Sequence, residues 1–176
     1  MKTHYTLDCE FNGFGGQLLS MALYTHERSV YLVRELHSAQ IAALDPWVLQ
    51  NVVSVLFKTP PDVQPLFFDD SAELAQLLSR FFAGTRPVIH TDWPDDIKYF
   101  CEALITGPGT MIDIPGISFE MHRVDSYPTS LVGAVQHNAW WDACVLYKHL
   151  LALDTPESAS LTHCHHVLSH REYSGL

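Results

Sequence analysis

The chain has 176 residues, of which 47% are hydrophobic and only 17% charged. This composition favours a single domain over residues 1–176 and excludes a disordered chain. No apolar run reaches the roughly 18–20 residues of a membrane span, and the N-terminal segment is unlike a signal peptide, so we expect a cytoplasmic protein without a membrane partner. The formal net charge of −10 excludes a broad basic surface for duplex nucleic acid, but not a local nucleotide site at which cations neutralise carboxylates. The four cysteines lack CxxC spacing, which predicts reduced thiols.

The first part of the chain predicts an antiparallel meander. Residues 4–10 alternate between apolar and polar side chains, which is typical of a strand. A glycine-rich turn at residues 12–16 follows, because glycine tolerates positive φ. Residues 18–24 and 29–36 predict two further strands, joined by a polar turn.

The rest of the chain predicts helices that alternate with short strands. Helical spacing occurs over residues 38–57 (with a break near Asp45-Pro46), 71–82, 94–105 and 138–153. Strands are expected at residues 87–90 and 111–114, and residues 117–121 are left undecided. The sequence therefore predicts an α/β fold with a mixed five-stranded sheet, an antiparallel meander followed by parallel strands, flanked by helices. The histidine-rich tail at residues 163–170 favours a polar helix over a Zn²⁺ site, since its spacing gives no tetrahedral set.

Two acidic side chains share one face of the first strand. Asp8 and Glu10 are two residues apart, so their side chains lie about 7 Å apart along that face. A solvated sheet face is the ordinary explanation for such a pair. The first strand of a mixed sheet usually lies centrally, however, where both faces are covered. Divalent cations between the carboxylates would remove their repulsion.

A second acidic group precedes the helix that begins at Pro94. Asp92 can cap this helix, with Asp95 in its first turn, in the manner of a capping box. Asp96 adds little to that explanation. It lies at a strand-to-helix connection, where ligand-binding groups collect in open α/β sheets.

The last helix carries an acidic residue on its apolar face. Asp142 shares a stripe with alanine and leucine side chains, and a buried carboxylate is costly unless it is paired or binds a metal. A salt bridge to an arginine is the alternative. His137 precedes the helix; alone it would be a surface or capping residue, but beside four acids it has the placement of a general base.

These residues resemble the motifs of the DEDDh 3′–5′ exonucleases, the family that includes RNase T. Asp8-Cys9-Glu10 is similar to the DxE motif, and the segment from His137 to Ala143 is similar to HxAxxDA. Asp96 fits the middle motif better than Asp95, because the apolar stripe of its helix is then in phase. The three motifs span residues 8–142 in the family's order.

The resemblance implies an RNase H-like fold and two Mg²⁺ or Mn²⁺ ions, about 3.5–4 Å apart, bound by Asp8, Glu10, Asp96 and Asp142. His137 would deprotonate the attacking water, and the products would be nucleoside 5′-monophosphates. The turn formed by Phe11, Asn12 and Gly13 would contact the terminal nucleotide, and Phe11 or Phe14 would either stack on a base or plug the core.

The expected partner is single-stranded RNA or a short oligonucleotide. The alternatives are a DNA-preferring exonuclease and a catalytically silent nucleic-acid-binding protein on the same fold. The apolar 47–57 segment could serve a homodimer, which the sequence does not decide.

Overall fold

The chain folds around a mixed six-stranded sheet with the strand order β4-β3-β2-β1-β5-β8. The computed structural model describes residues 2–123 and 131–154, so the histidine-rich tail lies outside the described residues. The strands of the sheet are β1 (Lys2–Phe11), β2 (Leu18–Tyr24), β3 (Ser29–Arg34), β4 (Leu66–Phe68), β5 (Arg86–Thr91) and β8 (Ser118–Met121). β1, β2 and β3 are antiparallel, whereas β4, β5 and β8 run parallel to their neighbours.

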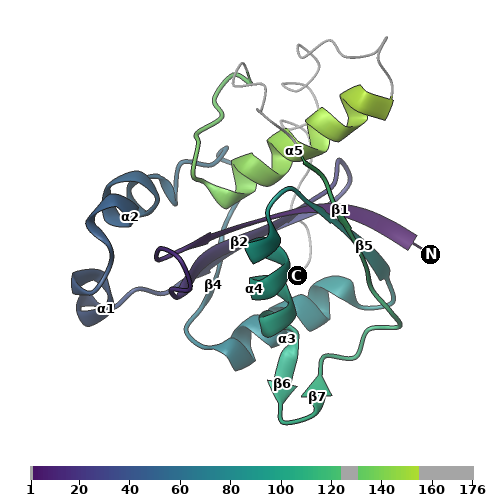
Figure 1. Ribbon diagram of the computed structural model, residues 1–176, viewed down its shortest axis with the longest axis horizontal. Helices are drawn as coiled ribbons and strands as arrows, with labels where there is room; N and C mark the ends of the chain where they lie inside the picture. Colours follow the sequence, from purple (N-terminus) through teal and green to yellow (C-terminus); the bar gives the residue numbers. More distant parts are fainter. Residues whose placement is uncertain (1, 124–130, 155–176) are drawn as a thin grey trace.

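Helices cover both faces of this sheet (Figure 1). The helices are α1 (Ser38–Ala42), α2 (Pro46–Asn51), the 3-10 helix η1 (Val53–Val55), α3 (Ser71–Phe82), α4 (Pro94–Ala103) and α5 (Ala139–Asp154). α5 packs over β1 and β2 on one face, and α4 contacts β1 and α3 on the other. The predicted α/β class with a mixed sheet and flanking helices is therefore confirmed, as is the break between α1 and α2.

The prediction of a five-stranded sheet was wrong, because the sheet has six strands. Residues 111–114 do not join the sheet, because β7 (Thr110–Met111) instead forms a separate hairpin with β6 (Ile105–Gly107). β8, from the segment 117–121, pairs with β5 instead, and β4 adds a sixth strand beyond β3. β4 has only three residues, so it offers almost no period to detect.

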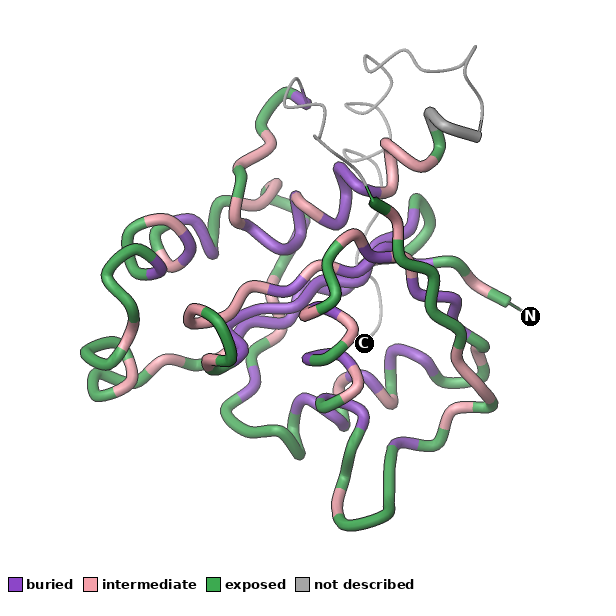
Figure 2. The backbone as a smooth tube through the Cα atoms, viewed as in Figure 1, coloured by how far each residue is buried: buried purple, intermediate pink, exposed green. Residues whose placement is uncertain are grey.

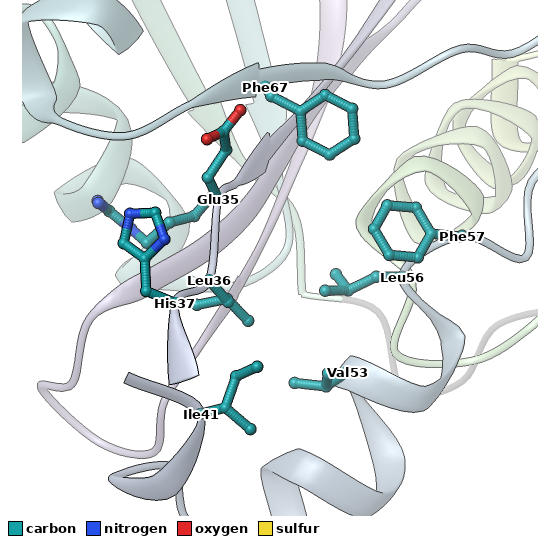
Figure 3. Close-up of a pocket in the computed structure, with 9 residues that line it drawn as sticks. Glu35, Leu36, His37, Ile41, Val53, Leu56, Phe57 and Phe67 are labelled. Atoms are coloured by element: carbon teal, nitrogen blue, oxygen red, sulfur yellow. The ribbon is translucent and has the colours of Figure 1, made fainter. Parts of the chain in front are cut away.

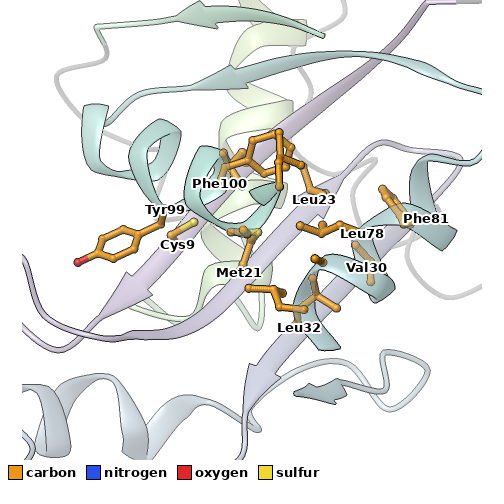
Figure 4. Close-up of a cluster of buried hydrophobic side chains, with 14 of the residues drawn as sticks. Cys9, Met21, Leu23, Val30, Leu32, Leu78, Phe81, Tyr99 and Phe100 are labelled. Carbon is orange, nitrogen blue, oxygen red and sulfur yellow. The ribbon is translucent and has the colours of Figure 1, made fainter. Parts of the chain in front are cut away.

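Two apolar clusters hold these layers together. The cluster between the sheet and α3 and α4 gathers Leu7, Cys9, Met21, Leu78 and Phe100 among others (Figure 4). The cluster on the opposite face joins β2 and β3 to α5 through buried aromatic and small side chains, among them Tyr31, Ala139 and Trp140. Figure 2 shows the buried residues running along the central strands and the inward turns of the helices. β2 and β3 therefore present alternate residues to two different cores.

The helix boundaries follow from local chemistry. Asp70 begins α3 by accepting a hydrogen bond from the Glu73 amide at 2.9 Å, and the positive φ of Gly84 follows the end of the helix. α4 begins at Pro94 with Trp93 as its N-cap, which makes no side-chain cap. The predicted capping role of Asp92 was therefore wrong.

Two further features of the described residues concern the cysteines and the apolar character of the helices. Cys9, Cys101 and Cys144 are free thiols, and Cys164 lies outside the described part of the chain. In residues 2–123 and 131–154, none of the helices has the length and apolar character that a membrane span requires.

Candidate active site

Five carboxylates from three parts of the chain converge on one side of the sheet. Oxygen atoms of Asp8, Glu10 and Asp142 lie within 4.8 Å of one another, and the same holds for Asp8, Asp92 and Asp96. Asp8 belongs to both groups. We call these five residues the acid cluster. The structure thus brings together the four acids singled out in the sequence and adds Asp92.

β1 positions Asp8 and Glu10 toward α5. Cys9 between them points into the opposite core, so the two acids share the face that α5 covers. The hydroxyl of Thr6 on this same face donates a 2.7 Å hydrogen bond to the Ala143 carbonyl, which fixes α5 over β1. A β-bulge at Glu10–Phe11 ends the regular pairing of β1 with β2, and such bulges re-aim side chains next to functional sites.

Asp96 accepts a hydrogen bond from a backbone amide of β1 that has no partner strand. The pairing of β1 with β5 stops at Thr6 and His90, so the later amides of β1 have no β5 partner. Asp96, which is only 2% exposed, accepts hydrogen bonds from the Cys9 amide at 3.1 Å and from the Thr91 hydroxyl at 2.7 Å. Asp95 instead accepts a hydrogen bond from the Trp93 indole at 3.0 Å and lies outside the acid cluster.

The beginning of α5 positions Asp142. Asn138, which is fully buried, accepts a hydrogen bond from the Trp141 amide and donates to the Val55 carbonyl at 2.8 Å, so it caps α5 and anchors it to η1. The carboxylate of Asp142 accepts hydrogen bonds from the backbone amides of His137 and Asn138. The charge of Asp142 is therefore held at the positive end of the helix dipole.

Burial and mutual repulsion govern the protonation of the acid cluster. Burial, followed by the charges of Asp96 and Asp142, raises the pKa of Asp8 well above its usual range. Burial and the charges of Asp142 and Asp96 raise the pKa of Glu10 to about 8. Burial also raises the pKa values of Asp96 and Asp142 to about 7 each. A site with so many competing negative charges favours a bound cation.

In the part of the chain that the structure describes, the acid cluster has no lysine or arginine partner that would neutralise it. Within residues 2–123 and 131–154, none of these acids forms an ion pair with a lysine or arginine; the basic group nearest to a pair is His137, whose Nδ1 lies 4.0 Å from Glu10 Oε1. Among the described residues, the salt bridge considered for Asp142 is thus not formed. Oδ2 of Asp8 is buried and has no hydrogen-bond partner among the residues described. An orphaned carboxylate oxygen among oxygen-only donors fits a hard divalent ion such as Mg²⁺ or Mn²⁺.

These pKa shifts predict that stability falls as the pH rises when divalent cations are removed. Unfolded carboxyl groups titrate near pH 4, whereas Glu10, Asp96 and Asp142 titrate near 7 to 8 in the fold. The folded state binds more protons between these values, so the free energy of unfolding should decrease by several kcal/mol from about pH 5 to about pH 8. Urea unfolding in EDTA at both pH values measures this change.

Saturating Mg²⁺ should restore most of the lost stability at the higher pH, because an ion that binds only the folded state stabilises it. Asp142→Asn should flatten the dependence on pH in EDTA and reduce the response to Mg²⁺. The lowered pKa of His137 acts in the opposite direction, but it belongs to a single half-exposed group. Stability that rises between the two pH values in EDTA would contradict the electrostatic account of the cluster.

His137 lies at the edge of the cluster in an unusual backbone conformation. Its φ of 62° is in the left-handed region, and it is the single non-glycine residue with positive φ in the described part of the chain. Burial lowers the pKa of its imidazole, and its ring makes an edge-on contact with Trp47 at 5.1 Å. A neutral imidazole beside the carboxylates can accept a proton near neutral pH.

The two phenylalanines at the turn after β1 have different surroundings, which bear on their predicted roles. Phe11 stacks on Tyr99 at 4.7 Å and packs against the α3–α4 core, which favours the packing alternative for this residue. Asn12 accepts a hydrogen bond from the Asp45 amide at 2.8 Å, and Gly13 has a φ of 66°. Phe14 is 96% exposed and offers a free ring.

Asp92 and Asn138 belong to this site but were not predicted as site residues from the sequence. The sequence around Asp92 is typical of a helix cap. Nothing in its spacing indicates that the N-cap of α4 is the next residue, Trp93. Asn138 lies between His137 and Ala139 of the HxAxxDA-like segment. An asparagine directly before an apolar helical run is a recognisable N-cap signal, which would have assigned its capping role.

A surface pocket of about 400 Å³ lies away from the acid cluster (Figure 3). It is formed by residues from the end of β3, α1, η1 and β4, including His37, Ile41, Leu56 and Phe57. None of the five carboxylates lines it. The site is therefore defined by its charged groups and not by this pocket.

Comparison with protein-family models finds no match to the chain, and no curated protein matches its sequence. The functional assignment consequently depends on the residues of the site and their geometry.

Proposed function

We propose that the protein is a metal-dependent 3′–5′ exonuclease of the DEDDh type with an RNase H-like fold. Its substrate would be RNA or a short single-stranded oligonucleotide, and its products nucleoside 5′-monophosphates. The observation that carries the proposal is the convergence of Asp8, Glu10, Asp96 and Asp142, from opposite ends of the chain, in one cluster beside His137 without lysine or arginine partners among the described residues. The antiparallel meander followed by parallel strands is compatible with the RNase H-like fold.

Two groups of ligands that share Asp8 suit a pair of cations. Asp8, Glu10 and Asp142 would hold one Mg²⁺ or Mn²⁺ ion, and Asp8 with Asp96 and Asp92 the other. When bound, such ions lower the pKa of a water nucleophile and stabilise the leaving 3′-oxygen. The orphaned Oδ2 of Asp8 supplies the acceptor that a second ion needs.

The protein's own groups would handle the proton and the terminal nucleotide. His137, held beside Glu10 and neutral because of its lowered pKa, would accept the proton of the attacking water. The exposed ring of Phe14 is placed by the turn after β1 to stack on a base, since stacking requires an accessible face. Phe11 would support this turn through its contact with Tyr99.

The proposed homodimer stays a prediction. Within the 47–57 segment, Trp47 is 54% exposed and Phe57 is 63% exposed, while Val48, Val52 and Leu56 are buried in the fold. The apolar character of the segment is thus partly explained by the interior of a single chain.

A nuclease assay tests the proposed activity. Single-stranded RNA and DNA of the same sequence, labelled at the 5′ end, are incubated with Mg²⁺, Mn²⁺ or EDTA. We expect successive shortening from the 3′ end, release of 5′-monophosphates, faster turnover of RNA and no reaction in EDTA. A 3′-phosphorylated substrate serves as the control, because a blocked terminus should slow an exonuclease but not an endonuclease.

The outcomes separate the alternatives. Faster cleavage of the DNA strand would favour the DNA-preferring exonuclease. Binding of either strand without product in any metal would favour the silent nucleic-acid-binding protein and contradict the proposed enzyme.

A further inference from the structure

A second group of side chains of the types that ligate metals lies on the same face of the sheet as the acid cluster. His90 on β5 has its Nδ1 2.9 Å from His122 Nε2 and 3.5 Å from Glu120 Oε2. One ligand atom from each of these three residues lies within 4.8 Å of the others. On the other side of the ring, His90 Nε2 is 2.8 Å from His4 Nδ1 on β1. We call His4, His90, Glu120 and His122 the histidine cluster.

The register of the sheet produces this cluster. Ile89 packs into the α3–α4 core and Phe119 contacts Phe100 of α4, so their neighbours His90 and Glu120 project from the opposite face. His90 and Glu120 are paired across β5 and β8, and the His122 amide extends the ladder with a 2.8 Å hydrogen bond to the Thr91 carbonyl. The ligand atoms are thus aligned by backbone pairing and not by flexible loops.

The cluster is partly shielded yet accessible. The side chain of His90 is 13% exposed, whereas that of Glu120 is 56% exposed. α5 packs mainly over β1 and β2 (Figure 1), whereas His90 and Glu120 belong to β5 and β8. An ion can therefore reach the cluster from solvent.

We propose that His90, Glu120 and His122 bind a transition-metal ion of the Zn²⁺ type, with His4 hydrogen-bonded to the ring nitrogen of His90 that faces away from the ion. Two imidazoles and one carboxylate with an open fourth position form a known ligand set for Zn²⁺. Ligand atoms of one tetrahedral Zn²⁺ lie about 3.3 Å apart, given bonds of about 2.0–2.1 Å to nitrogen. The observed separations of 2.9 and 3.5 Å lie on either side of this value.

The contact with His4 matches the proposed arrangement. A metal-bound histidine commonly donates its second ring N–H to a neighbouring acceptor, which fixes its tautomer. With Nδ1 of His90 on the ion, its Nε2–H points at His4 Nδ1. A metal-free row of three imidazoles would form the same hydrogen bonds, with Glu120 paired to His90 at 3.5 Å, so Zn²⁺ binding itself must distinguish the two arrangements.

The ligand chemistry separates this site from the acid cluster. Imidazole nitrogen suits Zn²⁺ and similar ions, whereas sites built only from carboxylates suit Mg²⁺ and Mn²⁺. A bound ion would fasten β8, a four-residue edge strand, to the central strand β5. Its binding does not depend on the nuclease proposal.

Zn²⁺ titration of the full chain against a chromophoric chelator, in excess Mg²⁺, tests the proposal. The wild-type protein should bind one tight equivalent of Zn²⁺ that Glu120→Gln and His122→Gln do not bind. Removal of a direct ligand should weaken this site at least about 100-fold, and His4→Ala about 10–100-fold, the range typical of residues that hydrogen-bond to a metal ligand. Zn²⁺ should also raise the melting temperature of the wild-type protein more than that of either ligand variant.

Two matched variants make the result specific. His165→Gln/His166→Gln alters histidines of the tail, and Asp142→Asn alters the acid cluster; both should keep the tight site. Melting temperatures in EDTA equal to wild type show that the ligand variants fold. Identical Zn²⁺ stoichiometry and affinity in wild type, Glu120→Gln and His122→Gln would overturn the proposal, as would loss of the site in the tail variant alone.

Discussion

Asp96→Asn is expected to lower the rate of 3′-terminal nucleotide release by at least about 10³-fold, because a catalytic metal contributes several kcal/mol to transition-state stabilisation. Asp95→Asn is expected to retain nearly full activity. Asp96 is buried in the acid cluster, whereas Asp95 bonds to the exposed Trp93. Steady-state rates on single-stranded RNA at saturating Mg²⁺ measure both changes.

The asparagine is chosen because it keeps the local fold. Its carbonyl oxygen can still accept the Cys9 amide, and its NH₂ group can donate to the Thr91 hydroxyl, so both contacts of Asp96 survive. Melting curves in EDTA should show that Asp96→Asn is folded, while its stabilisation by Mg²⁺ is reduced. Loss of activity in Asp95→Asn with normal activity in Asp96→Asn would move the middle ligand to Asp95. Normal activity in both would separate the acid cluster from catalysis.

The acids of the site were more predictable than their surroundings. Asp8 and Glu10 follow from strict alternation along a central strand, and Asp142 from its place on an apolar helix face. Asp92 was not predictable, because its position depends on where α4 begins: with Trp93 as the N-cap, the Asp92 side chain no longer caps the helix and instead joins Asp8 and Asp96. A shift of one residue in a helix boundary is within the uncertainty of any sequence pattern.

The histidine cluster shows a second limit of prediction from the sequence. His4, His90 and His122 are far apart in the sequence and follow no shared spacing, so only the register of β1, β5 and β8 brings them together. The pattern of β8 itself is weak, since all four of its residues are exposed. Long central strands are predictable because they alternate between two cores, whereas short edge strands are specified mainly by the neighbour with which they pair.

His137→Asn is expected to lower kcat by about 10²–10⁴-fold, the range typical of a lost general base. Asparagine is preferable to alanine here, because it tolerates the positive φ of this position and so leaves the start of α5 undisturbed. The affinity for Mg²⁺, measured by calorimetry on the folded variant, should change little, since the carboxylates supply the ligands. His37→Asn is the matched control: His37 is an exposed N-cap of α1 outside the site, and asparagine also caps helices.

The pH profile distinguishes a base from a residue that only shapes the site. The imidazole must be neutral to accept a proton, and burial lowers its pKa, so activity should fall on the acidic side of neutrality in the wild-type protein. Protonation of Glu10, Asp96 and Asp142 also lowers activity in this acidic limb of the profile. Metal binding shifts the pKa values of these carboxyl groups to lower pH. At saturating Mn²⁺ the remaining limb should therefore belong to His137 and disappear in His137→Asn. An unchanged limb with a modest loss of kcat would make His137 a positioning residue, and a large loss of metal affinity would make it a ligand.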